Sequence, residues 1–293
     1  MSLVEQAIAR MRNQTRAAAR KIAEAESKPA APPLVVDQAP DTAAKPAKRM
    51  TLNMEVLRVR GYLPEASEDQ VFADNYRRIK RPLVDKAMSG VTDVGEPRVI
   101  MITSALPGDG KTFTSINLAL SMALERDISE LLVDCDVARR HVSDIVGLRE
   151  EGGLLDALVD ESVDIESLVV HTNLRGLSIL PAGRRRVEAT TELLSSNRMR
   201  QVIANLCHRN PRRILLLDSP PLLITNEGRT LVKIAGQVVL VIRAGHTPRQ
   251  AVHDSIRLFD AQQAGGIILN QVQVSPVEGY LGYGSYGTDR DAT

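Results

Sequence analysis

Short apolar runs alternate with segments of helical length over the C-terminal two thirds of this chain. The candidate strands are residues 99–103, 131–134, 177–181, 214–218, 238–243 and 267–270, and the segments 113–124, 192–207 and 247–262 have helical length and spacing. Continuous apolar runs indicate strands that are buried on both faces. The pattern therefore predicts an α/β fold, a doubly wound and mostly parallel sheet with helices on both faces, which binds its ligand at the carboxyl ends of the strands.

The segment after the first candidate strand has the composition of a phosphate-binding loop. It reads Ala105-Leu-Pro-Gly-Asp-Gly-Lys-Thr112, with Ala where the strict Walker A pattern has Gly. A strand leads in and a helix leads out, so the backbone N–H groups of residues 108–112 can converge on a phosphate at the positive end of the helix dipole. The glycines allow close backbone approach, Lys111 is placed to reach the β and γ phosphates, and Thr112 is placed to ligate Mg²⁺.

Acidic residues end two further candidate strands. Asp134 and Asp136 follow one apolar run, and Asp218 ends another. Residues two apart in a strand share a face, so both members of the pair can approach Mg²⁺ or an attacking hydroxyl. Aspartates at strand ends also cap the helices that follow them. Beside a phosphate loop in the same sheet we favour the first interpretation, since Mg²⁺ on a nucleotide needs an aspartate there.

The C-terminal segment concentrates tyrosine in a chain that is poor in aromatic residues. Tyr280, Tyr283 and Tyr286 are three of only five tyrosines, and glycines separate them. This alternation has no amphipathic periodicity that would pack it onto a core, so we expect the phenolic hydroxyls to be presented to solvent. Together with the phosphate loop, the cluster suggests a kinase whose substrate is its own C-terminus.

The sequence predicts four parts along the chain. Residues 1–23 have the spacing of a short amphipathic helix that would dock on a partner or an acidic membrane surface, or self-associate. Residues 24–50 are rich in Pro and Ala and are predicted to be a linker. Residues 51–275 would form the catalytic domain, and residues 276–293 a flexible tail. Within the domain, a cationic helical segment runs from Asp74 to Pro82, where the helix should end or bend.

Composition limits the possible partners and compartment. The net charge of +1 gives no electrostatic argument for binding nucleic acid. No run of about 18 apolar residues is present, and the N-terminus lacks the features of a secretory signal. Cys135 and Cys207 lie in predicted core elements, which is typical of buried thiols in a reducing compartment. We therefore expect a cytoplasmic protein.

Several motifs in order resemble the bacterial tyrosine kinases of exopolysaccharide synthesis, from about residue 74 to the C-terminus. The N-terminal helix, the linker and the segment from Tyr76 onward are most similar to the exosortase-associated tyrosine autokinases. The motifs are the loop at residues 104–112, the Asp134-x-Asp136 pair, the run Leu180-Pro-Ala-Gly183 followed by Glu192-Leu-Leu-Ser195, the run Asp218-Ser-Pro-Pro221, and the tyrosine cluster.

The resemblance implies roles for particular residues. Catalysis would depend on Lys111 and on the Walker A′ and Walker B acids Asp134, Asp136 and Asp218, with Thr112, Asp134 and Asp218 as Mg²⁺ ligands. One acid of the A′ pair would accept or orient the proton of an incoming tyrosine, since a free phenol has a pKa of about 10. The residues that would hold ATP are Gly108, Asp109, Gly110, Lys111, Thr112 and Phe113.

The resemblance also implies an assembly. Asp74, Arg77 and Lys80 match the family's Glu-x-x-Arg-x-x-Arg oligomerisation motif with both outer residues substituted. In the family this motif helps to form a ring of subunits. In that ring, the tail of one subunit enters the site of the next. A membrane-anchored chain-length protein would activate the kinase and recruit it to the inner face of the membrane.

Two alternatives remain open at this point. The first is a positioning ATPase of the partition or division-site type, although Leu106 stands where those proteins carry a signature Lys. The second is a nucleotide-binding regulatory module without turnover. The segment after the second acid also departs from the family pattern, since residues 137–141 read Val-Ala-Arg-Arg-His and lack the usual Pro.

Overall fold

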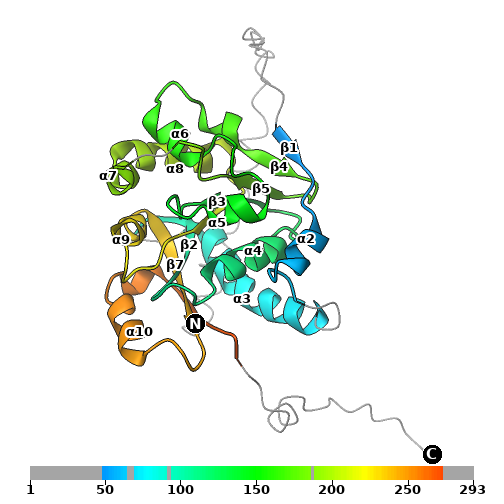
Figure 1. The fold of residues 1–293 in the computed structure, drawn as a ribbon, viewed down its shortest axis with the longest axis vertical. Helices are drawn as coiled ribbons and strands as arrows, with labels where there is room; N and C mark the ends of the chain where they lie inside the picture. The colour runs from blue at the N-terminus through cyan, green and yellow to red at the C-terminus, as the bar shows by residue number, and fades with distance from the viewer. Residues whose placement is uncertain (1–47, 65–68, 91–93, 186–187, 273–293) are drawn as a thin grey trace, which may run out of the picture. The chain divides into compact units, whose positions relative to one another are not determined.

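The computed structural model describes residues 48–64, 69–90, 94–185 and 188–272. These residues form an eight-stranded sheet with the order β1-β4-β5-β3-β6-β2-β7-β8 (Figure 1). Neighbouring strands are parallel except β4 and β5, which are antiparallel. The strands are β1 (Lys48–Met50), β2 (Glu96–Ser104), β3 (Ser129–Asp134), β4 (Val170–Thr172), β5 (Leu177–Leu180), β6 (Arg213–Asp218), β7 (Ala235–Arg243) and β8 (Ala264–Asn270). The predicted fold class is confirmed.

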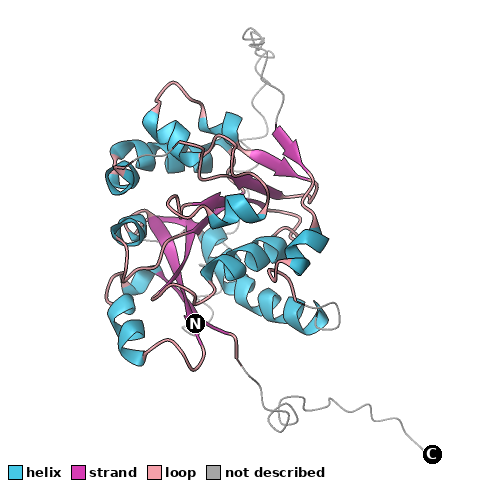
Figure 2. Cartoon of the chain, in the orientation of Figure 1, coloured by secondary structure: helices cyan, strands magenta, loops and turns pink. Residues whose placement is uncertain are grey.

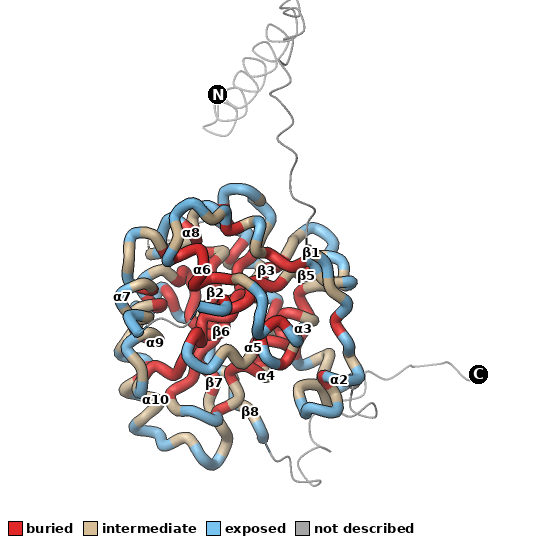
Figure 3. The backbone as a smooth tube through the Cα atoms, turned by 45° about the horizontal axis from the view of Figure 1, so that its top comes forward, coloured by how far each residue is buried: buried red, intermediate tan, exposed pale blue. Residues whose placement is uncertain are grey.

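Helices cover both faces of the sheet (Figure 2). They are α2 (Met54–Val59), α3 (Asp69–Ser89), α4 (Lys111–Met122), α5 (His141–Ile145), α6 (Leu154–Val159), α7 (Thr190–Ser195), α8 (Asn197–Arg209), α9 (Asn226–Val232) and α10 (Arg249–Ile256), with 3₁₀ turns η1 (Ile165–Leu168) and η2 (Ala261–Gln263). Alternate residues of a strand face opposite helix layers: Met101 belongs to the buried cluster that contains residues of α6, α8 and α9, and Ile102 belongs to the one that contains residues of α2 to α5. Figure 3 shows the buried residues concentrated in the strands between these layers.

The sequence pattern missed two short strands and one helix break. β1 and β4 have three residues each, which is too short for a periodicity to be detected. β1 consists of the last three residues of the predicted linker, so the folded domain includes residues before 51. The predicted helix over 192–207 is divided into α7 and α8 at Ser196, whose side chain accepts a hydrogen bond from the Met199 N–H and begins the second helix.

Helix α3 also departs from expectation. It continues through Pro82 to Ser89 instead of ending there. Tyr76, Leu83 and Ala87 are buried on either side of the proline, so packing against the sheet outweighs the hydrogen bond that proline cannot donate. Within the described ranges, no helix has both the length and the apolarity needed to cross a membrane. The predicted helix over 1–23, most of the linker and the tail over 276–293 lie outside the described residues.

Glu130, near the start of β3, is a buried acid that the fold compensates only in part, through the charge of Lys80. Its side chain is 1% exposed, and neither carboxylate oxygen has a hydrogen-bond partner among the described residues. Burial raises the pKa of Glu130 well above its ordinary value, and the nearby charge of Lys80 opposes that rise. The folded-state pKa therefore exceeds the unfolded one, so this carboxyl weakens the fold increasingly as the pH rises above the unfolded pKa.

Replacing Glu130 with Met should consequently stabilise the protein. We expect the free energy of unfolding to rise by about 1–3 kcal/mol at pH 8, because the variant removes a carboxylate whose charge is buried without a hydrogen-bond partner among the described residues. The gain should shrink as the pH falls toward about 4, where the carboxyl is neutral in both states. Urea unfolding at pH 5 and pH 8 measures it, with Glu161→Met at an exposed site as the control. A gain of equal size at both pH values would contradict the electrostatic explanation.

Candidate functional site

The order of the strands brings the predicted site residues to one edge of the sheet. β3, β6 and β2 are neighbours, with Asp134 paired in register to Asp218 and Asp218 paired to Ile102. The loop at residues 105–110 leaves the same end of β2 and leads into α4. The loop and both acidic strand ends therefore lie together at the carboxyl edge, as the doubly wound arrangement requires.

The backbone of the loop has the conformation that close approach to phosphate needs. Gly108 has φ of +88° and Gly110 has φ of +98°, both in the region that disfavours other residues. A Cβ atom on Gly110 would lie 1.9 Å from the Asn270 side-chain nitrogen, so this position also lacks space for a larger residue. Helix α4 begins at Lys111, and the first N–H groups of a helix have no partners within it. These groups are therefore free to bind an anion in front of the loop.

Two predicted nucleotide-binding residues use their side chains to shape the loop. The Asp109 carboxylate accepts hydrogen bonds from the Leu106 N–H at 3.0 Å and from the Thr247 hydroxyl at 2.8 Å. The Phe113 ring packs edge-on against Phe72, with the ring centroids 5.7 Å apart. The side chains of Asp109 and Phe113 are therefore engaged within the protein, and only their backbone groups can face a phosphate.

Lys111 and the acids form one connected cluster. The Lys111 ammonium donates to the Asp136 carboxylate at 2.8 Å and to the Thr112 hydroxyl at 3.3 Å. Asp218 accepts from the Thr112 hydroxyl at 3.0 Å and from the Ser115 hydroxyl at 2.8 Å. All five side chains are buried or nearly so. A buried ammonium and a hydroxyl thus stand between two carboxylates at the mouth of the loop.

Asp134 is held by a separate contact. One of its carboxylate oxygens accepts from the Ser143 N–H at 2.8 Å and from the Ser143 hydroxyl at 2.6 Å. Its other oxygen is buried and has no hydrogen-bond partner among the described residues. Burial raises the pKa of Asp134 to about 7; the charge of Asp218 adds to this, and the bonds from Ser143 oppose it.

The cluster carries more negative than positive charge. Burial raises the pKa of Asp218, against the lowering effect of Lys111. Burial disfavours the charged form of Lys111, but Asp218 and Asp136 outweigh it, so the pKa of Lys111 is raised and the ammonium stays charged. One ammonium therefore faces three carboxyl groups, and the raised pKa values of Asp134 and Asp218 indicate an environment that a further cation would stabilise.

The oxygen ligands at this edge fit Mg²⁺. They are the Thr112 hydroxyl, Asp218 and the unpaired oxygen of Asp134. Within the described residues, no group of three or more His, Cys, Asp or Glu side chains could hold a metal by itself. Mg²⁺ is commonly bound by one or two carboxylates together with substrate phosphates, so a nucleotide would complete the coordination.

Three residues that sequence reasoning missed support the site. Ser115 and Ser143 hold Asp218 and Asp134, and the Asn270 side chain donates to the Asp109 carbonyl at 3.0 Å. Asn270 ends β8, and a polar residue at the carboxyl end of a parallel strand is a signal that could have identified it. Ser115 lies four residues after Lys111 and therefore on the same face of α4.

The predicted oligomerisation residues differ in their exposure. Asp74 and Arg77 form an exposed ion pair at 2.8 Å. Lys80 is buried, and its ammonium contacts the Ser121 carbonyl and the Glu125 carboxylate, both at 2.7 Å. Lys80 therefore joins α3 to the end of α4 within the chain, while Asp74 and Arg77 remain accessible from outside.

Comparison with known proteins identifies the family of this chain. The AAA domain family matches residues 97–263, which is more than half of the chain. The chain belongs to the AAA domain family. It is 30% identical to the tyrosine-protein kinase Wzc of Salmonella typhimurium over 64% of its own length, although it spans only 26% of Wzc. It is 29% identical to the tyrosine-protein kinase CpsD of Streptococcus agalactiae over 66% of this chain and 82% of CpsD.

Solved structures agree with these relatives. The kinase domain of VpsO superimposes with a TM-score of 0.58 at 29% sequence identity, covering 71% of this chain and 100% of that domain. The resemblance to bacterial tyrosine kinases that the sequence motifs predict is confirmed. The narrower similarity to exosortase-associated autokinases stays a prediction.

Proposed function

We propose that this protein is an ATP- and Mg²⁺-dependent protein-tyrosine autokinase that phosphorylates the tyrosine cluster at residues 280–286. One observation carries the proposal: a phosphate loop, its lysine and three strand-end aspartates meet at one sheet edge in a chain related to tyrosine kinases. The regulation of exopolysaccharide polymerisation and export, through a membrane-anchored activator, belongs to the same proposal and rests on the resemblance.

The chain's own residues divide the work of phosphoryl transfer. The loop N–H groups and Lys111 would hold the β and γ phosphates, and Thr112, Asp218 and Asp134 would hold Mg²⁺. When bound, Mg²⁺ would neutralise charge on the phosphates. Binding of a phosphate to Lys111 would weaken the ion pair to Asp136 and leave that carboxylate available to orient the phenol. The phenolic oxygen would then form a bond to the γ phosphorus and give its proton to the Asp136 carboxylate, while the bond from that phosphorus to the β-phosphate oxygen breaks and ADP leaves.

Replacing Tyr280, Tyr283 and Tyr286 with Phe tests the acceptor. We expect the triple variant to lose nearly all phosphate incorporation during incubation with Mg-ATP, because no phenolic oxygen remains in the tail. Intact mass and phosphosite mapping measure the result. Tyr62→Phe, which changes a tyrosine of the folded domain, should retain it. Normal incorporation in the triple variant would overturn the proposal, because the phosphate would then be on other residues. A positioning ATPase would instead hydrolyse ATP equally in both chains and incorporate phosphate into neither.

A further inference from the structure

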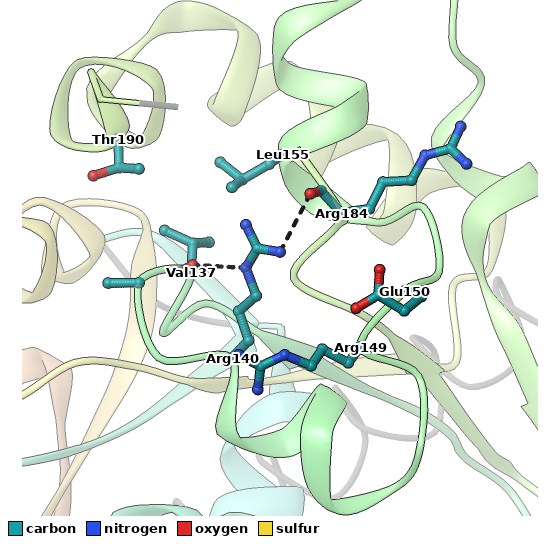
Figure 4. Close-up of a pocket in the computed structure, with 8 residues that line it drawn as sticks. Val137, Arg140, Arg149, Glu150, Leu155, Arg184 and Thr190 are labelled. Atoms are coloured by element: carbon teal, nitrogen blue, oxygen red, sulfur yellow. Dashed lines mark hydrogen bonds between the residues drawn. The ribbon is translucent and has the colours of Figure 1, made fainter. Parts of the chain in front are cut away.

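A cavity of about 450 Å³ opens beside the catalytic cluster. Its wall includes Val137, which directly follows Asp136, together with Arg140, Arg149, Arg184 and Thr190 (Figure 4). These residues come from the segment between β3 and α5, the segment after α5, the segment after β5, and the start of α7. The volume lies within the range of small-ligand sites.

The wall of the cavity has an excess of positive charge. Three arginines line it, against one carboxylate, Glu150. Arg149 pairs with Asp144 at 3.1 Å, and Arg184 lies 4.0 Å from Asp156; both arginines are about half exposed or more. Such exposed pairs are weak and can rearrange around a ligand.

Arg140 is held without a carboxylate partner. Its guanidinium donates to the backbone carbonyls of Val137 at 3.2 Å, Arg184 at 3.3 Å and Arg185 at 2.6 Å. Within the described part of the chain, it forms no ion pair with an acid. Carbonyl oxygens fix its orientation but leave its positive charge unneutralised, and Figure 4 shows the guanidinium between Val137 and Arg184.

The segment that carries Arg184 is also fixed. The buried Asp156 carboxylate accepts hydrogen bonds from the N–H of Arg184 at 3.1 Å and of Gly153 at 2.9 Å. Gly183 has φ of +102°, and a Cβ atom there would lie 2.7 Å from the same carboxylate. The arginines therefore stand on a backbone that is already in place, which lowers the entropic cost of binding an anion.

The chemistry of the wall selects a phosphate ester over a neutral group. A phosphotyrosine carries about −1.5 to −2 charges at neutral pH, and arginine binds phosphate through paired, charge-assisted hydrogen bonds. An unmodified phenol gains little from the same guanidinium groups. The negative charge of Glu150 disfavours a phosphate group near it. The phosphate therefore fits the side of the cavity that the arginines line.

Neighbouring tyrosines of the tail can reach both Asp136 and the cavity, because Val137 lines the cavity and directly follows Asp136. Tyr280, Tyr283 and Tyr286 are three residues apart, which corresponds to roughly 10 Å of extended chain. We infer that the cavity binds a phosphotyrosine of the tail while the next tyrosine of the cluster is presented at Asp136. This inference rests on the proposed kinase function and adds to it that the first phosphorylation promotes the following ones.

A binding experiment tests the cavity independently of catalysis. The full chain with all three tail tyrosines changed to Phe is titrated into a fluorescent peptide of residues 276–290 that carries phosphate on Tyr283. We expect binding about tenfold or more tighter than for the unphosphorylated peptide, because hydrogen bonds to charged groups contribute that much. Equal affinity for the two peptides would overturn the inference.

Variants and competitors identify the binding surface. Arg149→Gln with Arg184→Gln leaves the backbone contacts of Arg140 in place and should sharply lower the preference for the phosphopeptide. Arg175→Gln, at an exposed site before β5, is the matched control. Mg-ATP should not displace the phosphopeptide; displacement would assign these arginines to the nucleotide and refute the inference. An unchanged preference in the double variant would refute it as well.

A kinetic readout separates the two proposals. With the native tail, the arginine double variant should accumulate singly phosphorylated chains, because the later phosphates are added about tenfold more slowly relative to the first. Equal slowing of all phosphorylation steps would count against a role for the cavity in promoting the later phosphorylations. If the unchanged chain incorporates no phosphate, the kinase proposal fails, and the cavity's preference for phosphotyrosine is still decided by the titration.

Discussion

Replacing Lys111 with Met should lower tail phosphorylation about 10²–10³-fold, the range observed when one preorganised charge-stabilising group is removed from an active site. The Lys111 ammonium lies 2.8 Å from Asp136, and the charges of Asp218 and Asp136 raise its pKa, so it stays charged. Without it, the γ phosphate would meet the acids of the cluster with no cation from the cluster's own described residues. Phosphotyrosine incorporation over time with Mg-ATP measures the change.

The control for this substitution is Lys233→Met, at an exposed residue after α9. It removes the same charge from the chain and should leave the rate as it is. Thermal unfolding of both variants separates lost chemistry from lost structure. A Lys111 variant that unfolds cooperatively and still phosphorylates its tail at the normal rate would show that this lysine does not hold the transferred phosphate.

Replacing Asp218 with Asn should lower the phosphorylation rate by about 10²-fold, again within the range for a single charge-stabilising group. Asp218 accepts hydrogen bonds from Thr112 and Ser115 and fits a Mg²⁺ ligand. Asparagine keeps an oxygen acceptor but loses the charge that attracts the metal. The Mg²⁺ concentration that gives half the maximal rate should therefore rise, and a titration of Mg²⁺ at fixed ATP measures it.

The stability of this variant should change in the opposite direction to its activity. Burial raises the pKa of Asp218, so the charged carboxylate costs free energy in the fold, and a neutral side chain of the same shape removes that cost. Ser115→Ala is the matched control, because it removes the hydrogen bond from Ser115 to Asp218 and keeps the charge of Asp218. An Asp218 variant with an unchanged Mg²⁺ dependence would contradict the assignment of this aspartate to the metal.

The local patterns of the sequence determined the fold class and most of the candidate site. Apolar runs of strand length report burial on both faces, and the loop before Lys111 is defined by neighbours along the chain. Acids that follow such runs must lie at the carboxyl edge of a parallel sheet, whatever the order of the strands. For this reason Asp134, Asp136 and Asp218 could be placed with the loop before any contact was known.

Only the tertiary structure decided which of these groups touch. The pairing of Lys111 with Asp136, the capture of Asp134 by Ser143 and the burial of Lys80 all join different elements. The arginine cavity likewise depends on segments after β3 and β5 meeting beside the acids. Periodicity reports which face of its own helix or strand a residue lies on. The partners of that residue depend on the order of the strands and the packing of the helices. Both of these follow from burial summed over the whole chain.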